Sequence, residues 1–311
     1  MRSARTNRPF ARGTALVAVI WLIAILALAC MAALRVVSLD MDLAGAKIHG
    51  FRARQQAEMG IAVAANGAVK RDDPLLHRRV DETEGYDAKI VSEGGRFNLN
   101  ALLLRGDKSL LRSMFIDWGL NLDEAQEVVD ALGDWVDGDG EVSLNGAEKD
   151  WYEAQGRTNQ PFNRPFYSLE EARLVRGMDL VEAARPDWRN WFTIWSGGAL
   201  DANEADAALI AAAAEVPVDR ADQVVEHVRG PDGVRDTEDD APFQDIKDVL
   251  ALLGVNSELR PDIAQRFTLN DTTVRIESTG FAEGAKLRVS MVLRNRTGRP
   301  AILERSEEVI P

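Results

Sequence analysis

Gly13–Leu34, GTALVAVIWLIAILALACMAAL, is a run of 22 residues without a charge, and it decides the fold. A helix of this length spans ~33 Å, enough to cross a hydrocarbon core of ~30 Å. Before it, the chain carries four basic side chains and no acid, namely Arg2, Arg5, Arg8 and Arg12. The positive-inside rule therefore places the N-terminus in the cytoplasm. We predict a single membrane-spanning segment over residues 14–34.

A cleaved secretory signal is the alternative interpretation of this segment. Ala27-Leu28-Ala29 resembles the small-residue site at which such signals are cut. The apolar run is longer than the ~7–15 residues of an ordinary signal core, which favours retention in the membrane. The single cysteine, Cys30, lies inside this run, so the chain has no intramolecular disulfide.

The apolar pattern continues past the membrane segment. Apolar side chains recur at spacings of three and four as far as Asp73-Pro74, at Val37, Met41, Ala44, Ile48, Phe51, Met59, Ala62 and Val69. This spacing predicts an amphipathic half over residues 35–73 and one helix of ~90 Å from residue 14. A membrane anchor followed by an ordinary core helix is the alternative.

The rest of the chain changes its period twice. Residues 86–92 alternate, Gly94-Gly95 predicts a turn and 96–100 extended chain, so 74–100 is the first part of a sheet. Residues 101–265 have helical patterns, at 125–136, 169–176, 202–214, 222–228 and 245–253. Alternation returns in 266–311, at 267–269, 273–277 and 286–294, with a turn at Glu283-Gly284. The predicted class is α+β: a long helix on a small antiparallel sheet, with a large helical domain inserted between strands.

Charge limits the function. The net charge is −13, and without residues 1–13 it is −17. Such a surface repels phosphate backbones, so we predict no nucleic-acid partner. His49, His77 and His227 are far apart in sequence and no nucleophile motif occurs, so we predict that the chain is not an enzyme.

The first of two acidic loops follows the helix predicted at 125–136. Asp137, Asp139 and Glu141 alternate with glycines, Glu148 and Asp150 follow, and carboxylate oxygens are the ligands that calcium prefers. The loop is not an EF-hand, because the expected sixth-position glycine is Val142. We predict a calcium site; the alternative is a solvated helix end.

The second acidic loop lies near residue 235. It contains Asp232, Asp236, Asp239 and Asp240, whose charges repel one another unless a cation or solvent intervenes. We predict a second calcium ion, with an exposed mobile loop as the alternative. One or two structural ions would stiffen the helical insert in place of disulfides.

The N-terminus resembles the type IV prepilin signal: a basic leader ending in Gly13, then an apolar and an amphipathic half-helix. The resemblance implies that a prepilin peptidase cuts after Gly13, which makes Thr14 the first mature residue, with methylation at that new terminus. Most pilins carry glutamate at mature position five, where this chain has Ala18. The resemblance implies a subunit that does not accept a neighbour in the usual manner.

Three further segments resemble the family of the minor pseudopilin K of type II secretion. They are GGRFNLN (94–100), the acidic WVDGDGE…NGAE loop (135–148) and YSLEEARLVRGM (167–178). The match is weak at LDANEA (200–205), where the family usually has N-x-N-T-A. The resemblance implies two SAM-like or HhH-like modules, at about 101–195 and 199–265, and calcium at the first acidic loop.

The same resemblance implies a location and a role. The chain would sit in the bacterial inner membrane, with its C-terminal domain in the periplasm. It would form the tip of the type II secretion pseudopilus, with minor pseudopilins I and J bound through its N-terminal helix and sheet, and initiate assembly for protein export. Two alternatives remain: a minor tip pilin of a type IV pilus, and a membrane-tethered periplasmic hydrolase using Asp137, Asp139 and Glu148.

Overall fold

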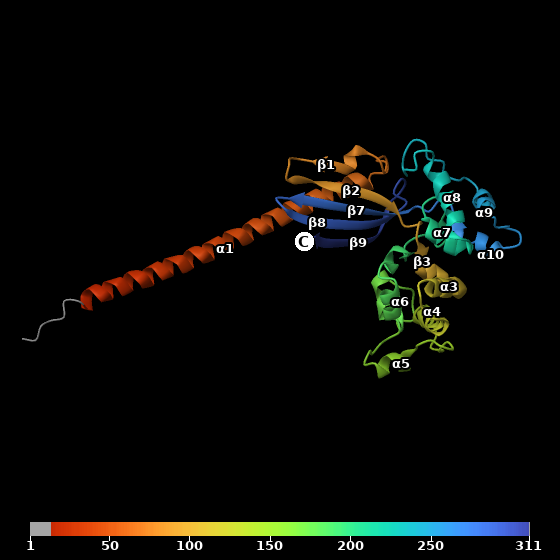
Figure 1. The fold of residues 1–311 in the computed structure, drawn as a ribbon, viewed down its shortest axis with the longest axis horizontal. Helices are drawn as coiled ribbons and strands as arrows, with labels where there is room; N and C mark the ends of the chain where they lie inside the picture. The colour runs from red at the N-terminus through yellow and green to blue at the C-terminus, as the bar shows by residue number, and fades with distance from the viewer. Residues whose placement is uncertain (1–13, 311) are drawn as a thin grey trace, which may run out of the picture.

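The computed structural model describes residues 14–310. Its dominant element is α1, Thr14–Ala65, a helix of 52 residues that projects from the body as a stalk (Figure 1). From Leu16 to Phe51 the helix side chains are exposed except for the half-buried His49, and burial begins at Ala53. Ala53, Ala57, Ile61 and Ala64 then form a buried stripe at a helical spacing. Three of the four are alanines, whose small side chains let the last turns of α1 pack closely on a sheet.

Helix α1 ends eight residues earlier than the predicted boundary at residue 73, so that prediction was wrong. Asn66 turns the chain, because its side-chain oxygen accepts a hydrogen bond from Ala68 N at 3.0 Å. Arg296 donates to the carbonyl oxygens of Ala64, Asn66 and Val69 at 2.8, 2.7 and 3.0 Å. These bonds satisfy carbonyls that a helix end leaves free.

The sheet covers one side of α1. It has five antiparallel strands in the order β1-β2-β7-β8-β9, with bounds β1 His77–Arg79, β2 Glu84–Ser92, β7 Thr273–Ala282, β8 Ala285–Arg294 and β9 Ala301–Ile310. The β7–β8 hairpin turns at Glu283 and Gly284, both with positive φ (48° and 83°), at the position that the sequence indicated. Strand β9 was not predicted, because it is an exposed edge strand with a polar pattern.

A helical domain lies between β2 and β7 in the chain, and it extends from the end of the sheet farther from the stalk (Figure 1). Its first part contains α2 Leu99–Leu104, α3 Lys108–Asp117, α4 Leu122–Val136, α5 Lys149–Ala154, the 3-10 turn η2 Leu169–Leu174, α6 Met178–Ala184 and η3 Trp188–Asn190. Its second part contains α7 Ala207–Ala214, α8 Val218–Arg229, α9 Ile246–Leu253 and α10 Pro261–Ala264. One hydrophobic core serves both parts, and a separate core joins α1 to the sheet. The predicted α+β class is confirmed.

Several predicted elements differ in detail. The chain at 96–100 does not extend the sheet: β3 (Phe97–Asn98) pairs in parallel with β4 (Phe192–Thr193) inside the insert. Likewise β6 (Phe267–Thr268) pairs with β5 (Leu200–Asp201), not with β7. β3 lies where the chain enters the insert and β6 where it leaves. Each forms a two-residue pairing with a strand inside the insert.

Three helices of the insert have other bounds than the sequence predicted. The helix predicted at 169–176 is the 3-10 turn η2, and Arg176 and its neighbours lead into α6. The helix predicted at 202–214 begins only at Ala207, because the Asp201 carboxylate accepts a hydrogen bond from Asn203 N and holds a turn there. The helix predicted at 222–228 is longer and runs over Val218–Arg229.

Candidate functional site

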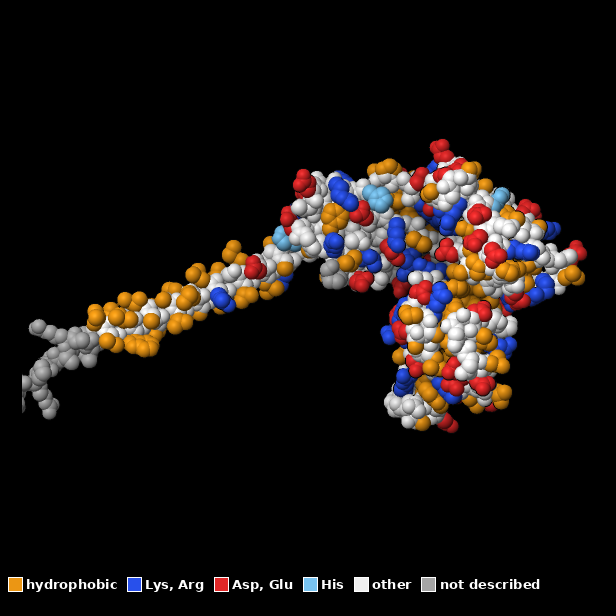
Figure 2. Space-filling view, viewed as in Figure 1, with side chains coloured by type: hydrophobic (Ala, Val, Ile, Leu, Met, Phe, Trp, Pro, Cys, Tyr) orange, Lys and Arg blue, Asp and Glu red, His pale blue; other side chains and the backbone are white. Residues whose placement is uncertain are grey.

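The stalk is the first functional feature. By length and composition, α1 from Leu16 onward could cross a membrane, and its most apolar window is wholly exposed. Hydrophobic side chains cover the stalk along most of its length (Figure 2). The exposed apolar surface continues beyond the uncharged run, at Val37, Met41, Ile48 and Phe51, which are 55–70% exposed. The predicted cleavage residue Gly13 lies outside the described residues, and Thr14 is where α1 begins.

The first acidic loop is built on the C-terminal end of α4. Asp134 in the last turn is wholly buried, and its two carboxylate oxygens accept hydrogen bonds from Ser143 N at 3.2 and 3.1 Å. Gly146 passes so close that a Cβ there would lie 1.9 Å from an Asp134 oxygen. The loop is therefore folded tightly around one buried carboxylate, which holds Asp137 and Glu148 at the two ends of the turn.

The carboxylates of this loop lie near enough to influence one another. Burial, together with the smaller effect of the charges of Asp134, Asp137 and Asp139, raises the pKa of Glu148 to about 7. Burial and the charges of Asp139 and Asp134 also raise the pKa of Asp137. Asp137 Oδ1 and Glu148 Oε1 are buried and find no hydrogen-bond partner within the described chain. Buried acceptors without donors are what a hard cation would satisfy.

The structure separates the predicted ligands of the first loop into two groups. The charges of Asp137 and Asp139 act on Glu148, which is buried, and Asp137 is half-buried; Glu141 and Asp150 have exposed side chains. Asp139 is also exposed, and its Oδ1 accepts a hydrogen bond from Glu141 N at 2.9 Å. Over residues 14–310, no three His, Cys, Asp or Glu side chains are already placed to hold one metal ion. Calcium at this loop therefore stays a prediction.

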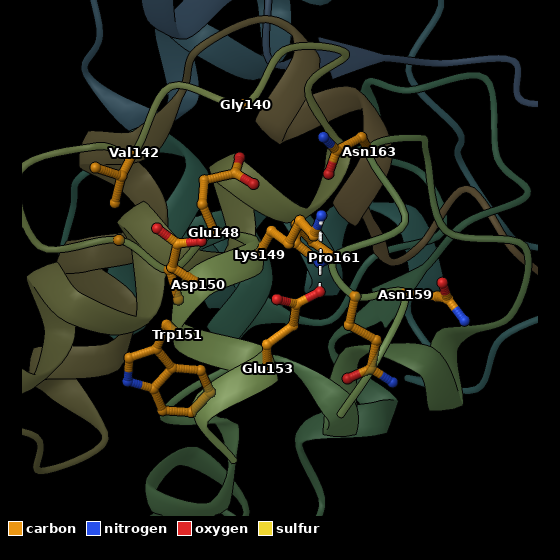
Figure 3. A pocket seen from close by; sticks show the side chains of 13 residues that line it. Gly140, Val142, Glu148, Lys149, Asp150, Trp151, Glu153, Asn159, Pro161 and Asn163 are labelled. Atoms are coloured by element: carbon orange, nitrogen blue, oxygen red, sulfur yellow. Dashed lines mark ion pairs between the residues drawn. The ribbon is translucent and has the colours of Figure 1, made fainter. Parts of the chain in front are cut away.

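Sequence reasoning did not select three residues that complete this region. Asp134 is one. The others are Gln160 and Asn163, from the loop after α5, whose side-chain oxygens are buried without a partner in the described chain. Both line a cavity of about 780 Å³ together with Glu148 and Asp150 (Figure 3). Only the buried position of Asp134 in an amphipathic helix could have been noticed in the sequence, because the amides come from a distant loop.

The second acidic loop is satisfied mainly by the protein itself. Asp239 Oδ2 accepts from Asp232 N at 3.0 Å, and Asp240 Oδ2 accepts from Asp236 N at 2.7 Å. Arg71, which follows α1, lies 3.4 Å from Asp236 Oδ1. Burial raises the pKa of Asp236, whereas the Arg71 charge opposes that rise. This loop thus offers fewer free oxygens to a cation than the first.

The three histidines lie on separate elements. His49 is on α1, His77 on β1 contacts the exposed Asp87 at 3.0 Å, and His227 on α8 stacks on Phe243 with ring centroids 4.4 Å apart. Neither of these two contacts is to a serine, threonine or cysteine nucleophile. The arrangement supports no acid–base or nucleophilic assignment.

The architecture defines a class: a pilin-like protein, with a long apolar N-terminal helix packed on an antiparallel sheet and a helical domain inserted between two of its strands. Residues 95–186 match the family model described as type II secretion system (T2SS), protein K. Over 109 residues the chain is 35% identical to the type II secretion system protein K of Klebsiella pneumoniae, which is 32% of this chain and 33% of that protein. Over these residues the chain is similar to type II secretion system protein K.

A solved structure has the same fold. The GspK-GspI-GspJ complex of enterotoxigenic Escherichia coli matches with a TM-score of 0.64 over 88% of this chain and 99% of the solved chain, at 14% identity. At that identity the likeness bears on fold alone. The sequence match, in turn, spans about a third of the length of the Klebsiella relative. The resemblance to protein K that the sequence indicated is confirmed over residues 95–186.

Proposed function

We propose that this chain is the minor pseudopilin at the tip of a type II secretion pseudopilus. The observation that carries the proposal is the placement of the helical insert, which extends the body beyond the end of the sheet, away from the stalk (Figure 1). A subunit stacked above would have to occupy the space of this insert. The chain therefore suits the end of a filament, from which assembly for protein export starts.

The partners follow from the family and from the stalk. The solved complex contains GspI and GspJ beside GspK, and we propose corresponding minor pseudopilins I and J as partners here. The exposed apolar side chains of α1 between Val37 and Phe51 lie beyond the uncharged run and have no cover within residues 14–310. Packing against the N-terminal helices of two partners would remove them from water.

Electron microscopy of filaments tests the tip position. Pseudopili overproduced together with this chain would be labelled with a gold-conjugated antibody against the insert. Gold at one filament end supports the proposal, and gold along the sides contradicts it. A filament that is a type IV pilus, assembled by a different machine, would support the alternative tip pilin. Deletion of the chain separates these two machines, because loss of exoprotein export would indicate type II secretion.

The topology is proposed from the leader and the apolar helix. The N-terminus lies in the cytoplasm, the helix remains in the inner membrane and the body lies in the periplasm. A prepilin peptidase would cut after Gly13. The intact mass of the protein purified in detergent tests this: a methylated Thr14 terminus supports processing, and a terminus beyond Ala29 contradicts it. Gly13→Val is expected to leave the leader in place.

We also propose a structural calcium ion at the first acidic loop. It is supported by the buried, unpartnered oxygens of Asp137, Glu148, Gln160 and Asn163. Calcium would raise the unfolding temperature of the full chain relative to chelator, and Asp137→Asn would remove that increment. Asp179→Asn, on the exposed surface of α6, is the matched control. An equal increment in both variants would contradict the site.

No catalytic role is proposed for this chain. The tethered-hydrolase alternative uses the same carboxylates, and it predicts hydrolysis of periplasmic polymers that Asp137→Asn abolishes. Calcium-dependent stability without such turnover supports the structural role. The second loop, with Asp232, Asp236, Asp239 and Asp240, stays a weaker candidate for another calcium ion, since backbone donors and Arg71 already engage it.

A further inference from the structure

The junction between the sheet and the helical insert contains a closed ring of polar contacts. Its centre is Glu93, a wholly buried residue directly after β2. Glu93 Oε1 accepts a hydrogen bond from Arg275 Nε on β7 at 2.6 Å, and Glu93 Oε2 accepts one from the Thr193 hydroxyl on β4. One buried carboxylate thus joins the sheet to the insert.

The ring closes through the far edge of the sheet. Arg275 Nη2 lies 3.9 Å from Glu304 Oε2 on β9, and that same oxygen accepts a hydrogen bond from Trp195 Nε1 at 2.8 Å. Trp195 N then donates to the Thr193 hydroxyl oxygen at 3.1 Å. The segment 193–195 of the insert is therefore held on β7 through Glu93 and on β9 through Glu304. Arg294 at the end of β8 adds a bond to the Trp195 carbonyl oxygen at 2.9 Å.

We infer that this ring is an orienting clamp, which fixes the angle between the insert and the sheet. Contacts on β7 and β9, with β8 between them, define a direction, whereas a single contact would allow rotation about it. The pairing is also hard to release, because leaving the buried Glu93 without its partners would strand a charge away from water. Glu93, Thr193 and Trp195 are positioning residues in this sense.

The clamp has a mechanical consequence. Helix α1 packs on the same sheet that the clamp grips, so stalk, sheet and insert move as one body. A displacement of the stalk along its axis would be delivered to the insert without bending at the junction. This inference stands apart from the proposed tip position, since it concerns the chain alone.

Distance measurement between spin labels on the full chain in detergent micelles tests the clamp. Labels at Asp179→Cys on α6 and Lys286→Cys on β8, in a Cys30→Ser background, report the insert relative to the sheet; both sites are exposed. The unaltered ring should give one narrow distance distribution. Thr193→Val with Trp195→Phe removes both donors of the insert but keeps the Glu93–Arg275 pair, and it should broaden or shift the distribution.

The same distance measurement provides the control and the results that would contradict the clamp. Thr279→Val, on the sheet but outside the ring, should leave the distribution narrow. Circular dichroism should show the same helix content in all variants. An unchanged narrow distribution in the double variant would overturn the clamp, and so would a loss of helix content, which would make these contacts part of the core.

Discussion

Arg296, in the turn between β8 and β9, donates a hydrogen bond at 2.8 Å to the carbonyl oxygen of Ala64, in the last turn of α1, although 232 positions separate the two residues. The same guanidinium also bonds the carbonyls of Asn66 and Val69. The stalk is thus ended and anchored by the sheet's last hairpin. A cation at a helix C-terminus is favoured by the helix dipole as well.

Replacing Arg296 should weaken the attachment of the stalk. Arg296→Met removes three hydrogen bonds from a charged donor, and we expect a loss of about 2 kcal/mol in the free energy of unfolding. Denaturant unfolding of the full chain in micelles measures it. Arg299→Met, exposed in the same turn, is the control, and an equal loss in both variants would show that the cap contributes nothing.

A second prediction concerns the close approach of β7 to α1. A Cβ on Gly280 would lie 2.0 Å from the Ala53 carbonyl oxygen and 2.3 Å from Ala57 N. Because both neighbours are backbone atoms, Gly280→Ala should push the helix from the sheet and cost about 2 kcal/mol or more.

The matched control for Gly280 is a glycine in the stalk itself. Gly50 lies in α1 and a Cβ there meets nothing within 4 Å. Gly50→Ala should therefore stabilise the helix by about 1 kcal/mol. Opposite signs for the two variants in thermal unfolding check the packing of α1, and a neutral Gly280→Ala would refute it.

The third prediction is a pH dependence. Burial raises the pKa of Glu148 to about 7, above the ~4.3 of an unfolded glutamate. Between these two pH values the folded chain therefore keeps a proton on Glu148 that the unfolded chain has released. Without calcium, stability should therefore fall as pH rises from about 4.5 to 7, by about 3 kcal/mol for this group. Unfolding in chelator across this range measures it.

Glu148→Gln should remove that part of the slope, whereas Asp150→Asn, its exposed neighbour, should keep it. Added calcium should stabilise most above pH 7, where Glu148 is ionised and able to serve as a ligand. A slope that survives in Glu148→Gln would assign the titration to another group.

The fourth prediction concerns the start of α4, the helix that carries Asp134. Asn121 and Glu124 form a capping box: Glu124 N donates to Asn121 Oδ1, and Asn121 N donates to Glu124 Oε2, both at 2.9 Å. Asn121→Ala should cost about 1 kcal/mol, and Asn121→Ser should recover most of it, because serine also caps. Thermal unfolding measures both, and equal losses would argue against the cap.

Much of the candidate site was visible in the sequence, and part of it was not. Asp137, Asp139 and Glu148 are close in the chain, and the structure brings them close in space. Gln160 and Asn163 come from a loop with no pattern of its own, so nothing in the sequence pointed to them. Glu141 and Asp150 were also expected as ligands; both are exposed, and of the two only Asp150 lines the cavity.

The sequence by itself determined the features that depend on neighbouring residues. These are the uncharged run, the switch from helical to alternating period, and the turn at Glu283-Gly284. A local pattern of apolar and polar residues predicts local structure. The tertiary structure alone decided where α1 stops, how the edge strand β9 pairs and how the insert is oriented. These depend on Arg296, Glu93 and Glu304 meeting partners far away in the chain, and no local pattern specifies such contacts.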